Sequence, residues 1–167
     1  TCVENGVNVK VLTKRADFID NFFGLLASYG NFDEEQYREY TAFGFTLTGH
    51  DELERGASSN IERISAMEEL HNRGYRIFAS IEPIVDFPSS MQMINSSLPF
   101  CDLYKIGLMS GNGVTYDPVE AHPFLSELQQ LPGQPKIYLK NSLVRFLGVD
   151  RKILPENFVE SNYNMFG

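Results

Sequence analysis

Residues 43–86 read FGFTLTGHDELERGASSNIERISAMEELHNRGYRIFASIEPIVD, which is the pattern of a strand, a polar loop, a helix, a tight turn and a second strand. The first part alternates apolar residues with Gly and Thr, the period of a β-strand. Ser59 and Glu62 have the spacing of a capping box, so a helix is predicted to begin there. Gly74 stands where a left-handed cap would end that helix, and residues 76–85 follow as the second strand. A strand-helix-strand unit of this kind makes its two strands parallel.

The predicted helix of this unit carries an apolar stripe at spacings of three and four residues, which is typical of a helix that packs on a sheet. The residues expected to be buried along it are Ile61, Ile64, Ala66, Met67 and Leu70.

Strands and helices are predicted to alternate along the whole chain. The strands are expected to end near residues 13, 48, 85, 110 and 140. This rhythm is typical of an α/β fold with a parallel sheet, and the chain has no Gly-rich phosphate-binding turn that would indicate a dinucleotide-binding sheet. We therefore expect a partial (β/α) TIM-type barrel over residues 1–147, with about five parallel strands in sequential order and helices on the outer face. Residues 148–167 are expected to form an irregular tail packed on it.

Composition limits the classes of function. The chain has 167 residues, 43% of them hydrophobic, and a formal charge of −8, which disfavours binding to nucleic acid by bulk attraction. Any bound anion must therefore be held by a local cluster of cations. No apolar run is long enough to cross a bilayer and no basic-then-apolar leader is present, so we expect a cytoplasmic protein without a membrane partner. Cys2 and Cys101 are too few and too far apart for a disulfide scaffold or a local metal motif, and are expected to be ordinary thiols.

Ligands of parallel sheets bind at the carboxyl ends of the strands. The polar residues that the predicted strands place at that edge are Lys14, Arg15, Thr46, Thr48, His50, Ser80, Glu82, Asp86, Lys105, Ser110, Lys140 and Asn141. Each also has a plain structural interpretation as a solvent-facing cation, a member of an internal ion pair or an inert histidine. Lys105 and Lys140 lie in apolar strands, where a lysine normally has an anionic partner. For Glu82, the expected partner is Lys105 first and Lys14 second.

A set of short motifs, in this order, resembles the second half of a radical SAM barrel. The motifs are Val-Leu-Thr-Lys-Arg (residues 11–15), Phe-Thr-Leu-Thr (45–48), an Asp-Glu-Leu-Glu-Arg-Gly loop (51–56) followed by a Glu-Arg helix, Ser-Ile-Glu-Pro-Ile (80–84) and Lys-Ile-Gly-Leu-Met-Ser-Gly (105–111). The resemblance covers roughly residues 8–145. Within that superfamily, the sequence is most similar to the branch that includes spore photoproduct lyase-like proteins and phage-associated radical-SAM-like proteins.

The resemblance implies cofactors and a division of roles. In the family, a 4Fe-4S cluster reduces S-adenosylmethionine to a 5′-deoxyadenosyl radical, which abstracts hydrogen from a substrate in the barrel. By this resemblance, the cofactor-binding residues would be Thr46, Thr48, Ser80, Ile81, Glu82 and Ser110. The substrate-binding residues would be Lys14, Arg15, Lys105 and Lys140.

One motif of that family is missing. The Cys-x-x-x-Cys-x-x-Cys motif that holds the cluster is absent, and Cys2 and Cys101 cannot replace it. In the family this motif lies before the strand with which the chain begins. We therefore expect the C-terminal portion of a longer protein, inactive alone. Its partner would be the missing N-terminal half of the barrel or a second copy, covering the bare first strand and the concave face unless the tail folds over them.

Two other functions stay open at this stage. The chain could be a complete lyase or aldolase-like enzyme of the (β/α) type, with Lys105 or Lys140 as a Schiff-base nucleophile. It could also be a non-catalytic domain that binds a small anion or a partner.

Overall fold

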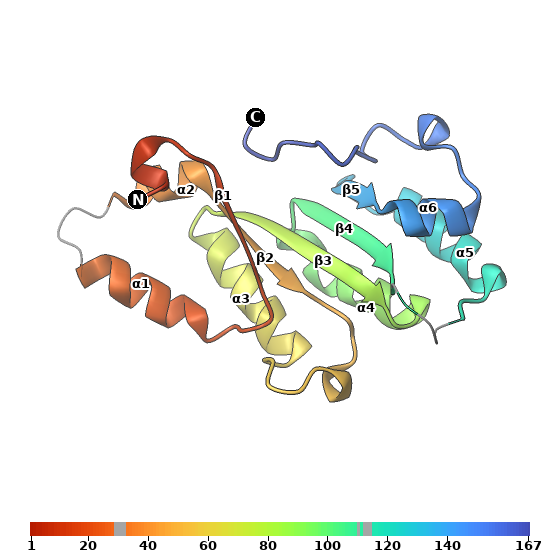
Figure 1. Ribbon diagram of the computed structural model, residues 1–167, viewed down its shortest axis with the longest axis horizontal. Helices are drawn as coiled ribbons and strands as arrows, with labels where there is room; N and C mark the ends of the chain where they lie inside the picture. The colour runs from red at the N-terminus through yellow and green to blue at the C-terminus, as the bar shows by residue number, and fades with distance from the viewer. Residues whose placement is uncertain (29–32, 110, 112–114) are drawn as a thin grey trace.

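The computed structural model of the protein describes residues 1–28, 33–109, 111 and 115–167. The described strands form one parallel sheet in the order β1-β2-β3-β4-β5, so each strand lies beside its neighbour in sequence (Figure 1). Their bounds are β1 Val9–Thr13, β2 Thr41–Thr46, β3 Arg76–Ile84, β4 Leu103–Leu108 and β5 Lys136–Leu139. The predicted α/β fold, a partial barrel of sequential parallel strands, is confirmed.

Helices connect the strands and cover one face of the sheet. Their bounds are α1 Phe18–Ser28, α2 Glu34–Tyr40, α3 Asn60–Asn72, α4 Phe87–Ser97, α5 Pro118–Gln129 and α6 Asn141–Leu147. Figure 1 shows α1, α3 and α4 on one side of the sheet and the C-terminal tail on the other. The main core lies between the helices and alternate strand residues, among them Phe43, Phe45, Ile77, Ala79 and Ile106, all fully buried. Because side chains alternate along a strand, the intervening residues point to the opposite, helix-free face.

The central unit folds as its sequence pattern predicts, with one change in the helix. Ser59 caps α3 in a reciprocal capping box with Glu62, and Gly74 follows the helix with a φ of +85°. The buried stripe, however, differs from the prediction, because Ile61 is 73% exposed. The buried positions are Asn60, Arg63, Ala66, Met67 and Leu70, so two polar residues head the stripe. The reason is an ion pair of Arg63 that is described with the site below.

The C-terminal tail packs on the helix-free face, toward the amino ends of the strands. Phe158 forms a parallel bridge with Ile137 of β5, and the chain then crosses the sheet. Near its end, Met165 joins a small core whose other buried members are Ala42, Phe78 and Leu103. Residues 148–167 therefore pack on the helix-free face of the sheet.

Two features of the sheet bear on where a partner or ligand could bind: its edge at β1 and the extent of the core under the tail. Among the described strands β1 pairs with β2 alone, and Leu12 on β1 is 54% exposed, so β1 is an open edge of the described sheet. The small core under the tail draws its sheet residues from the amino halves and middle of the strands. Among the described residues, the strand residue of this core that lies nearest the candidate site is Tyr138 of β5, the register partner of Lys105.

Candidate functional site

Three polar residues stand side by side across the helix-free face. Thr46 of β2 is in register with Ser80 of β3, and Ser80 is in register with Lys105 of β4. Their chain neighbours Phe45, Ala79 and Ile106 are buried against the helices, so the three polar side chains share the other face. The structure thus brings together three of the residues that the sequence placed at this edge. We call Thr46, Ser80 and Lys105 the polar row.

Among the residues that the structure describes, the two hydroxyl groups of the row have no hydrogen-bond partner. Thr46 and Ser80 are only 5% and 6% exposed, yet neither side-chain oxygen makes a hydrogen bond within the described residues. Neither oxygen is among the fully enclosed side-chain atoms that lack a hydrogen-bond partner, so solvent reaches both hydroxyls. The Thr46 and Ser80 hydroxyls are therefore groups that a ligand on this face would satisfy.

Lys105 has an aromatic rather than an acidic neighbour. Its Nζ lies 4.6 Å from the centroid of the Phe78 ring, which is a cation–π distance. Among the described residues, it forms no ion pair with a carboxylate. Burial lowers the pKa of Lys105, and repulsion from Lys10 and Lys140 lowers it further.

Glu82 and Lys140 form an ion pair beyond the row, in which the Lys140 ammonium donates to Glu82 Oε2. The predicted partners of Glu82, Lys105 and then Lys14, are therefore wrong. The pair spans from β3 to the residue after β5, across Gly107 of the intervening β4. A Cβ on Gly107 would lie 3.0 Å from Glu82 Oε1 and 3.0 Å from Lys140 Cδ, so the missing side chain makes room for the pair.

Lys14 and Thr48 are engaged by a buried carboxylate that the sequence reasoning missed. Glu54 Oε2 accepts from Thr48 Oγ1 at 2.9 Å and from Arg63 Nη2 at 2.5 Å, and Lys14 Nζ lies 2.9 Å from Oε1. Burial by itself would raise the pKa of Glu54, but the hydrogen bonds from Arg63, Lys14 and Thr48 hold it below its usual value. Arg63 is fully buried and also donates to the Thr46 carbonyl oxygen at 2.7 Å. This network fixes the carboxyl end of β2.

The remaining predicted site residues lie apart from the row. Arg15 is exposed and pairs with Asp17. Ile81 is fully buried on the helix side, so only its backbone is available to a ligand. Ser110 lies outside the described residues.

His50 and Asp86 meet at the same edge of the sheet. His50 Nε2 lies 2.5 Å from Asp86 Oδ2, and His50 Nδ1 lies 2.8 Å from Glu52 Oε1. Hydrogen bonds with Asp86, and then with Glu52, raise the pKa of His50. Asp86 also caps α4 by accepting from the Ser89 backbone N–H. The pair therefore links the loop after β2 to the start of α4.

The sequence contained partial signals for the residues that were missed. Arg63 stands within an otherwise apolar helix stripe, which indicates a buried cation with an acidic partner, and Glu54 lies in the acidic loop just before it. Gly107 lies in the Lys-Ile-Gly motif, but its spacing role needs the positions of β3 and β5. Phe78 gave no signal, because a strand phenylalanine is ordinarily a core residue.

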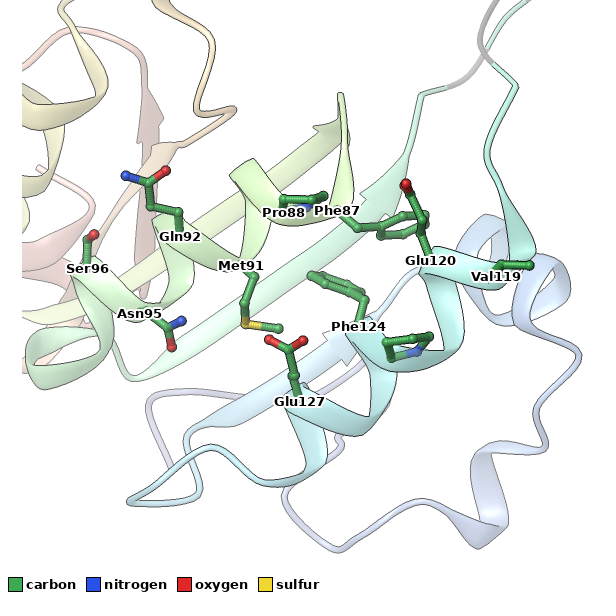
Figure 2. A pocket seen from close by; sticks show the side chains of 11 residues that line it. Phe87, Pro88, Met91, Gln92, Asn95, Ser96, Val119, Glu120, Phe124 and Glu127 are labelled. Carbon is green, nitrogen blue, oxygen red and sulfur yellow. The ribbon is translucent and has the colours of Figure 1, made fainter.

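A separate groove lies on the outer surface between α4 and α5 (Figure 2). Its volume is about 780 Å³, and Met91 of α4 and Phe124 of α5 converge in it. Its charged lining residues are Glu120 and Glu127, and no described lining residue is a cation. The groove belongs to the helical layer and contains none of the predicted site residues, so we place the candidate site at the polar row.

Comparison with known proteins gives no family for this chain. No family model, curated protein or solved structure matches it. Within the described residues, no three His, Cys, Asp or Glu side chains are grouped so that they could hold a metal ion. None of the described helices has the length and apolar character needed to cross a bilayer. Function is therefore argued from the site itself.

Proposed function

We propose that this chain supplies the S-adenosylmethionine- and substrate-binding portion of a radical SAM enzyme. The observation that supports this most is the pair of hydroxyls, Thr46 and Ser80, which have no hydrogen-bond partner among the described residues and lie beside the Glu82–Lys140 ion pair on the helix-free face. Thr46 is the last residue of β2, and Glu82 and Lys140 lie at the carboxyl ends of β3 and β5, where ligands of such sheets bind; Ser80 stands midway along β3. The order of the sequence motifs along those strand ends gives independent support.

The residues present fit the chemistry of S-adenosylmethionine. Its ribose hydroxyls can pair with the Thr46 and Ser80 hydroxyls, each of which can donate and accept. Its amino-acid end carries an ammonium and a carboxylate, which match Glu82 and Lys140 respectively. When bound with a reduced cluster, the cofactor supplies a radical for hydrogen abstraction. The part of this chain is to bind and orient the cofactor and the substrate, with Lys14 and Lys105 toward an anionic substrate.

The residues do not fit a 4Fe-4S cluster. Cys2 is exposed and Cys101 is buried, and burial raises the pKa of Cys101 to about 12, so that it stays a thiol. Cluster ligands are thiolates. In this proposal the cluster ligands come from outside these 167 residues, and the chain alone performs no radical chemistry. The partner would cover the open edge at β1, either as the N-terminal half of the barrel or as a second copy.

Calorimetric titration with S-adenosylmethionine tests the proposal on the chain as it stands. Saturable binding is expected, and Glu82→Gln should weaken it about 10- to 150-fold, because one hydrogen bond to a charged group contributes about 1.5–3 kcal/mol. Glu127→Gln is the matched control, since Glu127 lies in the outer groove, and it should leave the affinity unchanged. Absence of binding, or equal affinities for the two variants, would contradict the proposal.

A further inference from the structure

We propose that Lys105 is a nucleophile that forms an imine with small 2-oxo acids and aldehydes on the helix-free face. This activity goes beyond the proposed function, since it requires neither S-adenosylmethionine nor a cluster. It rests on the surroundings of Lys105, which differ from those of the other lysines at this edge.

The lysines on these strands differ in whether they have a carboxylate partner. Lys140 is paired with Glu82, and Lys14 is paired with Glu54. A carboxylate partner stabilises the ammonium form, which is not nucleophilic. Lys105 has no such partner in the described part of the chain, and its amine lies over the Phe78 ring instead. The structure therefore selects Lys105 from the two lysines, Lys105 and Lys140, that the strand pattern left open.

The charges that face Lys105 also favour its neutral form. Lys10 on β1 and Lys140 after β5 both repel its ammonium, and burial acts in the same direction, so that the pKa of Lys105 is lowered. Among the described residues, other titratable groups on this face include Glu82, which is engaged by Lys140, Tyr138, which is in register with Lys105, and Arg76, whose guanidinium lies over the Phe166 ring. Lysines that act as nucleophiles are activated by desolvation and by neighbouring cations in this way.

The residues beside Lys105 define the substrate class. Ser80 is its register partner and Thr46 stands next in the row, so two unpartnered hydroxyls are available to donate to a carbonyl oxygen. The ammonium of Lys140 lies on the same face and can bind a carboxylate. A carbonyl group next to a carboxylate, as in a 2-oxo acid, satisfies both features.

The reaction balances without an oxidant or a reductant. The lone pair of the Lys105 amine attacks the carbonyl carbon, and the carbonyl oxygen takes up a proton to give a carbinolamine. Its hydroxyl group then leaves as water, with one proton from the nitrogen, and a C=N bond forms. The reverse reaction is hydrolysis of the imine.

Reductive trapping with glyoxylate and cyanoborohydride tests this proposal. Hydride from the reagent reduces the imine to a stable carboxymethyl-lysine, which peptide mass spectrometry locates. At neutral pH, Lys105 should be labelled severalfold faster than Lys152, an exposed lysine in the same chain that serves as the internal control. Lys105→Arg keeps the positive charge and should abolish the fast phase, with circular dichroism confirming that the sheet is intact. S-adenosylmethionine is absent throughout, so failure to bind it would leave this test unaffected.

A second variant tests why Lys105 is selected. Glu82→Gln removes the partner of Lys140, so labelling should appear at Lys140 while it continues at Lys105. Labelling of Lys105 no faster than Lys152 would overturn the proposal. A fast phase that persists in Lys105→Arg, or a Lys140 that stays unlabelled in Glu82→Gln, would overturn it equally.

Discussion

Arg63 is the residue on which the carboxyl end of β2 depends most. It is fully buried, and its guanidinium joins Glu54 to the backbone of Thr46, the first member of the polar row. The Glu54 side chain is only 6% exposed. The two buried charges are tolerated because they pair with each other, and removal of Arg63 leaves Glu54 with only the half-exposed Lys14 as a cation.

Arg63→Met should therefore lower the free energy of unfolding by about 3–5 kcal/mol, the cost of breaking a buried ion pair. Urea denaturation measures the change. Arg15→Met is the matched control, because Arg15 pairs with Asp17 at the surface, where ion pairs contribute about 1 kcal/mol or less. Similar losses for the two variants would show that the buried network has no special role.

The His50–Asp86 pair predicts a pH-dependent contribution to stability. The pKa of His50 is raised above 6.5, so its contribution is complete below that value and is lost as the pH rises through the raised pKa. The pKa of Asp86 is lowered below 3.8, because hydrogen bonds from Ser89 and His50 outweigh the effect of burial, so its contribution is lost only as the pH falls through the lowered value. The pair therefore stabilises the fold most in mildly acidic solution.

Wild type should exceed His50→Gln in the free energy of unfolding by about 1 kcal/mol at about pH 5.5. The difference should shrink at about pH 9, where an ordinary histidine is neutral. Urea unfolding of both proteins at the two pH values provides the measurement. A difference that is the same at both would mean that His50 acts through packing rather than charge.

At the scale of elements, the close approach of β2 and β3 side chains on the helix-free face depends on Gly44. The Phe78 ring lies across this glycine, and a Cβ at Gly44 would be 2.2 Å from Phe78 Cε2 and Cζ. The same ring packs under the tail and beneath the Lys105 amine, so its position couples three parts of the molecule.

Gly44→Ala should destabilise the protein by about 1–3 kcal/mol, the usual cost of overpacking a core. The loss should be smaller in a Phe78→Leu background, where the ring is absent. Gly24→Ala in α1 is the control, because nothing lies within 4 Å of its added Cβ, and it should stabilise the helix by about 0.5–1 kcal/mol. Urea unfolding measures both changes. If both substitutions changed the free energy of unfolding in the same direction, the result would contradict this explanation.

Elements with local signals were predictable, and features fixed by distant partners were not. The alternation in β2 and the capping box at Ser59 depend on neighbouring residues, so the sequence predicts the central unit and the parallel order. The Glu82–Lys140 pair joins residues 58 positions apart, and choosing it over Lys105 required knowing that Gly107 lies between them. The prediction that Ile61 is buried on α3 was wrong, because the side of the helix that carries Arg63 and its buried ion pair faces the sheet. The path of the tail has no periodic signal, because it follows contacts with remote strands.

At the scale of the whole molecule, the sheet presents two different faces. Helices bury one face of the central strands, while the tail packs on the other face toward the amino ends of the strands. What remains is a polar strip with unpartnered hydroxyls, one ion pair and one lysine without a carboxylate partner among the described residues. The ligand-binding surface that we propose is this strip, and not the groove between α4 and α5.

Mapping of S-adenosylmethionine binding by amide chemical shifts is the most direct test of this claim. On titration, the backbone amides of the polar row, Thr46, Ser80 and Lys105, should shift together along a single saturation curve. The amides around Met91 and Phe124 in the outer groove should stay unchanged. Shifts confined to the groove, or no saturable shift in the polar row, would contradict the account.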